Sequence, residues 1–214
     1  MIEYPSIIAS AKAPKKPMLA FEKIDGSNIR VKWTPKNGFC LFGSRECLLD
    51  ATHPHLGGVV HLFDSTLKDE MDHLLRGYFA KEKEVVVFGE YWGPNSLAGI
   101  HVDPPDQMHL TIFDLLVVKK SYTEFVLPQD FVKIMANTTV PTPRFLRDGN
   151  LNEEFIQQVR ENKFDPPLNE GVVCKGRERS GAHRGKVWMC KIKTNQYMNR
   201  LKERYGQDWG RFWE

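Results

Sequence analysis

The sequence is dominated by apolar runs of strand length that are not separated by regularly spaced helices. Residues 84–90 (EVVVFGE) and 109–118 (HLTIFDLLVV) are rich in β-branched and aromatic residues and are long enough to form buried strands. Residues 28–33 (NIRVKW) alternate between apolar and polar, and residues 39–43 (FCLFG) follow a Lys-Asn-Gly turn signal, which predicts a hairpin. The pattern lacks a strict βαβ rhythm and therefore predicts the α+β class, with largely antiparallel sheets flanked by helices.

Further elements follow from periodicity and from turn residues. Two more strands are expected at 170–175 (EGVVCK) and 186–193 (KVWMCKIK), separated by a basic loop that contains glycine. Apolar residues at helical spacing predict helices at 65–82, at 128–135, at 152–162 and from Asn195 onward. For the first of these, Asp64 or Ser65 is the expected N-cap. Residues 1–17 are expected to lie across the surface.

Composition places the chain among ordinary globular proteins. The chain has 214 residues, of which 41% are hydrophobic and 27% are charged. It contains no apolar run of about 18 residues that could span a bilayer, and its start lacks the layout of a signal peptide. We therefore expect no membrane association and a cytoplasmic location, in a host cell if the gene is viral. The net charge of +3 does not diagnose a partner, but the cationic stretch 175–193 suits a polyanion.

The cysteines and histidines give little indication of a metal or disulfide site. The four cysteines form no CxxC pair, and we expect them to be reduced and mostly buried. They are Cys40, Cys47, Cys174 and Cys190. His53 and His55 with His61 could bind a metal, but ordinary loop histidines are the favoured interpretation.

Polar side chains gather instead at the ends of the predicted strands. They are Lys23 with Asp25, Glu90, Glu170, and Lys191 with Lys193. Each alone has an ordinary explanation, such as lysines that protect a sheet edge from aggregation. Because each follows or precedes an apolar β-run, next to a glycine or another charge, we expect these side chains to converge on one cleft.

This set of residue types suits nucleophilic attack on a nucleotide. Lys191 and Lys193 would share a strand face, where a polyphosphate could lie between them. A lysine has a pKa of about 10.4 in water, and a nearby cation or burial would favour its neutral, nucleophilic form. Asp25, Glu90 and Glu170 offer the oxygen ligands that magnesium prefers. Lys23 could then attack an α-phosphate and release pyrophosphate.

The motifs resemble those of the covalent nucleotidyltransferase superfamily of polynucleotide ligases and mRNA capping enzymes. KIDG at 23–26 is similar to motif I, KxDG, and five further elements resemble motifs Ia, III, IIIa, IV and V in the expected order. They are SR at 44–45, FGEYWG at 88–93, FDLL at 113–116, EGVVCK at 170–175 and KIK at 191–193. The resemblance implies an ATP-grasp-like nucleotidyltransferase domain.

Details within the motifs resemble ATP-dependent RNA ligases of the nick-sealing type. The Glu-Lys pair at 22–23, the GSN sequence at 26–28 and the FGEYWG stretch carry this likeness. It implies three steps: formation of lysyl-AMP, transfer of AMP to a 5′-phosphate, and attack by a 3′-hydroxyl. The implied cofactors are ATP and Mg²⁺, with Mn²⁺ as an alternative metal, and the implied substrate is nicked duplex RNA or an RNA-containing duplex. Asp25 is a departure, because many such enzymes have His there.

The resemblance also implies roles for residues on the nucleotide side of the site. Lys23 would form the covalent bond to AMP, and Glu22 would lie at the adenine edge. Phe113 would stack on adenine, with Asp114 supporting the site. Asn28 would contact the phosphate that is transferred in the later steps.

On the phosphate side, Arg45 would contact a phosphate or the acceptor strand end. Lys191 and Lys193 would grip the phosphates, and Glu90 would contact the ribose or the metal's ligand shell. The implied ligands of the metal's water shell are Asp25, Glu90 and Glu170.

Size sets this chain apart from larger ligases. Only 21 residues follow Lys193 (214 − 193 = 21), too few for a five-stranded OB barrel with strands of about five residues. We expect one adenylyltransferase domain over residues 1–214 without an OB-fold domain or its motif VI, and a monomer.

Three alternatives stay open. A DNA ligase and a GTP-using capping transferase share the chemistry, although Asn28 and the missing OB domain count against capping. A nucleic-acid-binding relative without turnover would share the fold. The intact nucleophile Lys23 and its charged neighbours count against that last alternative.

Overall fold

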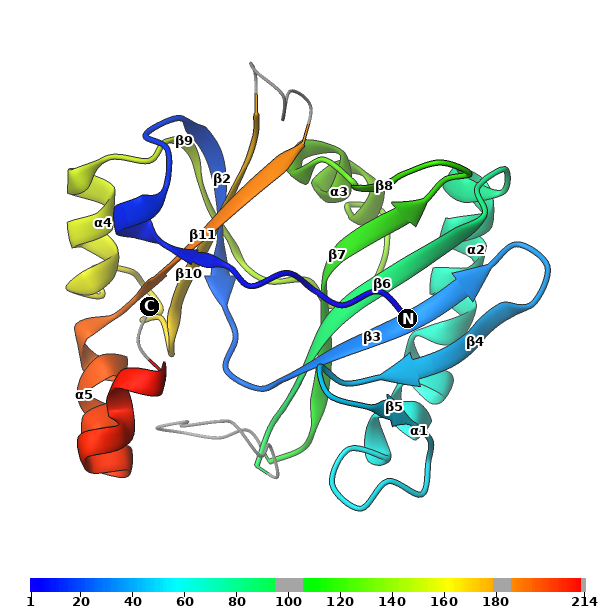
Figure 1. The fold of residues 1–214 in the computed structure, drawn as a ribbon, viewed down its shortest axis with the longest axis horizontal. Helices are drawn as coiled ribbons and strands as arrows, with labels where there is room; N and C mark the ends of the chain where they lie inside the picture. The colour runs from blue at the N-terminus through cyan, green and yellow to red at the C-terminus, as the bar shows by residue number, and fades with distance from the viewer. Residues whose placement is uncertain (95–105, 179–185, 213–214) are drawn as a thin grey trace. The chain divides into compact units, whose positions relative to one another are not determined.

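The computed structural model describes residues 1–94, 106–178 and 186–212. The chain forms two compact units, each built on its own sheet (Figure 1). The first unit combines Met1–Pro5 with most of the chain from Gly26 to Thr142, and the second combines Ser6–Asp25 with the described residues after Thr142.

The first unit has a six-stranded antiparallel sheet with the order β5-β4-β3-β6-β7-β8. Its strands are β3 (Ser27–Thr34), β4 (Gly38–Gly43), β5 (Leu48–Leu49), β6 (Glu84–Trp92), β7 (His109–Val118) and β8 (Thr123–Phe125). Its helices are α1 (Gly58–Thr66), α2 (Lys68–Phe79) and α3 (Pro128–Met135). The predicted hairpin is confirmed as β3–β4, and Gly38 takes the positive φ of 64° that this turn requires.

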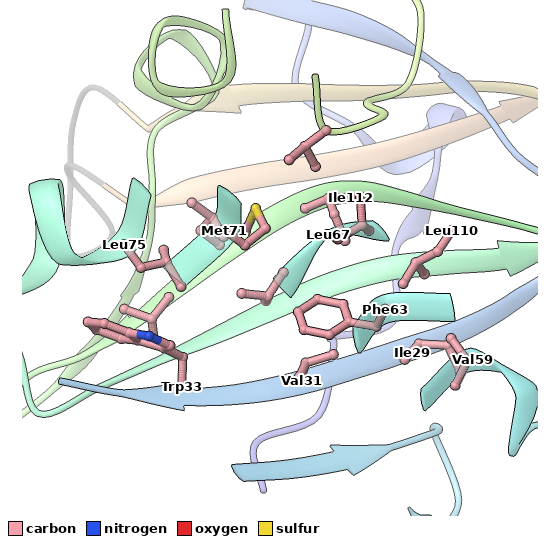
Figure 2. Close-up of a cluster of buried hydrophobic side chains, with 14 of the residues drawn as sticks. Ile29, Val31, Trp33, Val59, Phe63, Leu67, Met71, Leu75, Leu110 and Ile112 are labelled. Atoms are coloured by element: carbon pink, nitrogen blue, oxygen red, sulfur yellow. The ribbon is translucent and has the colours of Figure 1, made fainter. Parts of the chain in front are cut away.

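The core of this unit follows the sequence pattern directly. Ile29, Val31 and Trp33 all point from β3 to one face of the sheet and are at most 1% exposed. Figure 2 shows them facing apolar side chains of α1 and α2. Trp33 also donates from Nε1 to Asp72 Oδ1 of α2 at 2.7 Å, so the buried indole has a polar partner.

The prediction of one helix over 65–82 is wrong at its start. The helical region begins at Gly58 and is interrupted at Leu67, whose φ and ψ are −122° and −25°. Its buried stripe recurs every four residues, at Val59, Phe63, Leu67, Met71 and Leu75. Within the described residues no side chain caps either helix, so the expected cap at Asp64 or Ser65 is wrong as well. The stripe continues through the break because burial of the apolar face outweighs local capping.

The second unit has a five-stranded sheet with the order β1-β11-β10-β2-β9. Its strands are β1 (Ile8–Ala9), β2 (Pro17–Lys23), β9 (Phe145–Asn150), β10 (Gly171–Arg177) and β11 (Val187–Lys193). Its helices are α4 (Glu153–Arg160), α5 (Asn195–Tyr205) and the 3₁₀ segments η1 (Ser10–Lys12) and η3 (Gly206–Phe212). Only the β1–β11 pair among these is parallel.

One face of this sheet forms the core and the other carries charged groups. The core face presents Ala20, Val172, Cys174 and Ile192 toward α4, and each of these is fully buried. Alternation then places Lys23, Gly171 and the lysines of β11 on the opposite face. The helices predicted at 128–135, at 152–162 and after Asn195 are confirmed as α3, α4 and α5.

Two other expectations need correction. Residues 1–17 do not simply lie across the surface, because Ser10 is 1% exposed and β1 pairs with β11. The cysteines are not mostly buried: Cys174 and Cys190 are buried register partners, whereas Cys40 and Cys47 are exposed. Residues 91–107, whose many Gly and Pro residues predict irregular structure, lie mostly outside the described residues. Among the helices of the described parts, none has the length and hydropathy needed to cross a bilayer.

Candidate active site

Three strands of the second unit bring the predicted nucleophile and its partners together. Gly171 of β10 is the register partner of Lys23 on one side and of Lys193 on the other. The preceding residue, Glu170, is 2% exposed and lies between the two lysines. Lys23 Nζ is 2.6 Å from Glu170 Oε2, and Lys193 Nζ is 3.4 Å from Glu170 Oε1. The carboxylate thus divides its two oxygens between two ammonium groups.

The close approach of these strands requires glycine at position 171. A Cβ built there would lie 2.0 Å from the backbone oxygen of Ile192, a distance that no side chain can occupy. The glycine next to Glu170 in the EGVVCK motif therefore has a physical reason, since it keeps β10 close to β11 at the site.

Asp25 joins this cluster through a tyrosine of α5. Asp25 is 5% exposed, and its Oδ1 accepts a hydrogen bond from the hydroxyl of Tyr197 at 3.1 Å. Burial raises the pKa of the Tyr197 phenol, and the negative charges of Glu170 and Asp25 raise it further. The phenol therefore keeps its proton and acts as a hydrogen-bond donor.

Burial also lowers the pKa of one lysine of the cluster. Desolvation lowers the pKa of Lys193, the charge of Glu170 opposes this shift, and the charge of Lys23 adds to it. Lys191 is half-buried two residues earlier on the same strand, and Ile192 between them is fully buried in the core. The expected alternation of this strand is confirmed.

The side chain of Glu22 lies on the face of β2 opposite to that of Lys23, which is the face that packs against the core. Its Oε2 is 3.0 Å from Arg144 Nε, and the backbone N–H of Asn169 also donates to its carboxylate. Burial raises the pKa of Glu22 although both partners oppose this shift. Its carboxylate is therefore held in a fixed direction.

The remaining candidates belong to the first unit. Asn28 and Glu90 are register partners on β3 and β6. Asp114 of β7 is 3% exposed and accepts a hydrogen bond from the hydroxyl of Tyr4. The half-buried Phe113 packs edge-on against Tyr4, with ring centroids 5.1 Å apart. Arg45 is exposed in the bend after β4.

The structure thus distributes the predicted residues over both units. It brings Lys23, Asp25, Glu170 and Lys193 together in the second unit. In the first unit, Glu90 is close enough to the Tyr4–Asp114 pair for its charge to raise the pKa of Tyr4. Burial and Asp114 contribute more to this shift.

Sequence reasoning missed two residues of the second unit. Tyr197 reads as an ordinary core residue of an amphipathic helix, so nothing in the sequence marked it. Lys175 is 4% exposed, and its Nζ lies 5.4 Å from the ring centroid of Phe21. Its position four residues after Gly171 on the same strand could have indicated that it shares the charged face.

The described residues contain no group of three His, Cys, Asp or Glu side chains that could ligate an ion directly. This holds for the His53, His55 and His61 group as well as for the predicted acidic ligands. The carboxylates of Asp25 and Glu170 are nevertheless the donor type that a hydrated Mg²⁺ or Mn²⁺ uses, since such ions keep several waters. The donor set therefore fits a metal that is held through water.

One of three comparisons with known proteins identifies a family. The family model described as RNA ligase matches residues 16–193. No curated protein matches the sequence. The structure is similar to that of Naegleria gruberi RNA ligase with pyrophosphate, with a TM-score of 0.68 and 17% identity over 95% of this chain and 58% of that one. A mutant of the same enzyme with ATP and manganese has a TM-score of 0.63 and 18% identity, over 92% of this chain and 59% of that one.

At 17% and 18% sequence identity, the similarity to these solved structures establishes the fold alone. The α+β nucleotidyltransferase fold with two mostly antiparallel sheets is therefore confirmed. The chain spans somewhat more than half the length of the solved structures that it matches.

Proposed function

Because the chain belongs to the RNA ligase family, we propose that it is an ATP-dependent RNA ligase that joins a 3′-hydroxyl to a 5′-phosphate. The observation that carries the proposal is the pairing of Lys23 with the buried Glu170 at a distance of 2.6 Å, beside Lys193. A lysine needed only for solubility would not be held by a carboxylate that is 2% exposed.

In the first proposed step, Lys23 Nζ attacks the α-phosphate of ATP. A bond forms between nitrogen and phosphorus, the bond to the bridging oxygen breaks, and pyrophosphate leaves. The Lys23 ammonium must first lose its proton to solvent, and Glu170, whose Oε2 lies 2.6 Å from Nζ, would orient the resulting amine. A bound divalent cation would favour the neutral amine and stabilise charge on the phosphate. Asp25, Glu170 and Glu90 would hold that cation through its waters.

Other residues would bind the nucleotide. Lys191 and Lys193 would contact the phosphates from their shared face, and Glu22 would meet the adenine edge in the direction set by Arg144. Phe113 would stack on adenine while Asp114 supports the site through Tyr4. Asn28 and Arg45 would contact the phosphate and the acceptor end in later steps.

We further propose that the substrate is nicked duplex RNA or an RNA-containing duplex. The AMP on Lys23 would pass to the 5′-phosphate, and the 3′-hydroxyl would then displace AMP to seal the strand. Residues 1–214 would act as one adenylyltransferase domain, as a monomer in the cytoplasm.

A direct test is to incubate the protein with α-labelled ATP and magnesium and to separate it on a denaturing gel. We expect label from ATP on the protein, no label on Lys23→Ala, and normal labelling of Lys81→Ala, which replaces an exposed lysine in the turn after α2. Retained label on Lys23→Ala would remove Lys23 from the nucleophile role.

The same gel separates the alternatives. Label from α-labelled GTP instead of ATP would favour a capping-type transferase. Comparison of nicked RNA with nicked DNA distinguishes the RNA ligase from a DNA ligase. A protein that takes up no label and seals no pre-adenylylated nick would support the inactive binding relative.

A further inference from the structure

Helix α5 begins directly at the candidate site. Thr194 follows Lys193, is fully buried, and accepts a hydrogen bond at Oγ1 from the backbone N–H of Tyr197 at 3.1 Å. This N-cap fixes the first turn of α5 at the end of β11. The position of Tyr197 is therefore set by the same strand that carries Lys193.

Tyr197 contacts two members of the charged cluster with two parts of its side chain. Its hydroxyl donates to Asp25 Oδ1 at 3.1 Å, and Lys193 Nζ lies 5.1 Å from its ring centroid. The side chain is 4% exposed. A phenylalanine would fill the same space, and burying a hydroxyl costs free energy unless it is paired, so packing alone does not account for a tyrosine here.

A second residue of α5, Arg200, contacts the segment that leads into Glu170. Arg200 lies over the Tyr197 ring, with Cζ 5.3 Å from the centroid. One of its terminal nitrogens donates to the backbone oxygen of Asn169 at 2.7 Å and to its Oδ1 at 2.9 Å. Asn169 immediately precedes Glu170. Helix α5 thus binds the chain after β2 through Asp25 and the chain before β10 through Asn169.

We propose that Tyr197 is a positioning residue for the first step of the reaction, acting through Asp25 and Lys193. This inference rests on the proposed function, because it assigns Asp25 to the water shell of the metal. The hydroxyl holds one oxygen of Asp25 in place, so that the carboxylate presents a fixed direction to that shell. The ring at the same time restricts Lys193 beside Glu170.

The test is the variant Tyr197→Phe, which removes the hydroxyl and keeps the ring. Metal binding is measured directly by the electron paramagnetic resonance signal of free Mn²⁺, in the presence of α,β-methylene-ATP, which cannot transfer AMP. A hydrogen bond to a charged group supports an expected weakening of Mn²⁺ binding by about tenfold. The magnesium concentration for half-maximal labelling should rise by a similar factor.

The control is Tyr205→Phe, a hydroxyl deletion near the end of the same helix, where the ring lies under Arg204. It should bind Mn²⁺ like the wild type. The double variant Asp25→Asn with Tyr197→Phe should bind Mn²⁺ as weakly as Asp25→Asn alone, because a residue that acts through Asp25 has no effect once that carboxylate is gone.

The outcomes separate this inference from the proposed function. Unchanged Mn²⁺ binding in Tyr197→Phe, or additive losses in the double variant, would overturn the role of Tyr197 while leaving the ligase proposal intact. If the melting temperature of Tyr197→Phe were far below that of the wild type, the hydroxyl would be a group needed for folding. That result would overturn the positioning role as well. A wild type that takes up no AMP contradicts the proposed function, and the Mn²⁺ comparison still decides the role of Tyr197.

Discussion

Four charged side chains of the second unit balance one another at the residue scale. Lys23 and Lys193 supply two positive charges, and Asp25 and Glu170 supply two negative ones, three of the four being less than a tenth exposed. Such a set is costly to bury, and removing one member leaves an uncompensated charge behind. The presence of this cluster is therefore better explained by a role in a chemical reaction than by a contribution to the stability of the fold.

This balance predicts that Glu170→Gln destabilises the fold as well as the reaction. Loss of the carboxylate leaves two ammonium groups facing each other, and we expect the free energy of unfolding to fall by about 3 kcal/mol. Urea denaturation measures the change. The control is Glu153→Gln, which breaks the exposed pair of Glu153 with Lys15 and should cost about 0.5 kcal/mol or less. Equal losses in both variants would contradict the prediction.

At the scale of elements, Trp33 and Asp72 tie strand β3 to helix α2. Burial alone would raise the pKa of Asp72, but hydrogen bonds from Arg76 and Trp33 outweigh it and the pKa lies below its usual 3.8. A carboxylate whose pKa is lowered in the folded state stabilises that state at neutral pH. This stabilisation is lost as the pH falls through the lowered pKa.

We therefore expect Asp72→Asn to unfold more easily than the wild type at pH 7, by about 1 kcal/mol. Since the stabilising charge is titrated in acid, the two proteins should converge in stability below the usual pKa of 3.8. Thermal unfolding at several pH values measures this. Asp64→Asn, at an exposed ion pair with Lys68, should follow the wild type at every pH. A difference between Asp72→Asn and the wild type that does not change with pH would contradict this account.

The elements that the sequence predicted are those with a strong local pattern. Strands β3, β6 and β7 and helices α3 and α4 have clear periodicity, and their existence and type are confirmed. Strand β9 was missed because its sequence, FLRDGN, is mostly polar and it forms only by pairing with β2. Strand β1 has two residues, too few for any periodicity.

The same distinction holds for the candidate site. The convergence of Lys23 and Glu170 could be expected because each lies at an end of an apolar β-run, next to a glycine or another charge. The contact of Tyr197 with Asp25 could not, because the two residues are 172 positions apart and a tyrosine on an amphipathic helix looks the same whether or not its hydroxyl has a partner. The roles assigned to individual site residues stay predictions.

For the molecule as a whole, the steps of the proposed reaction that precede transfer of AMP to the nucleic acid can be tested separately from the sealing step that follows it. In the proposed scheme, Lys23 would be needed only to take up AMP and to carry it to the 5′-phosphate. We therefore expect Lys23→Ala to seal a nick that already carries a 5′-adenylyl group, in the absence of ATP, at a rate within about tenfold of the wild type. Gel electrophoresis of a labelled nicked duplex measures sealing. Loss of sealing by Lys23→Ala on this substrate, in a variant that melts like the wild type, would mean that Lys23 also acts after AMP transfer.

The distance in sequence between Lys23 and Glu170 also has a consequence for synthesis of the protein, because Lys23 is made long before the carboxylate that pairs with it. The two residues are 147 positions apart, and Lys193 and Tyr197 follow later still. A ribosome adds about 5 to 20 residues per second, so Lys23 is made roughly 7 to 30 seconds before Glu170. Until β10 and β11 have joined β2, Lys23 has an ordinary amine environment without the carboxylate that holds it. The growing chain would therefore gain the capacity for AMP attachment only when nearly all of these 214 residues have been made.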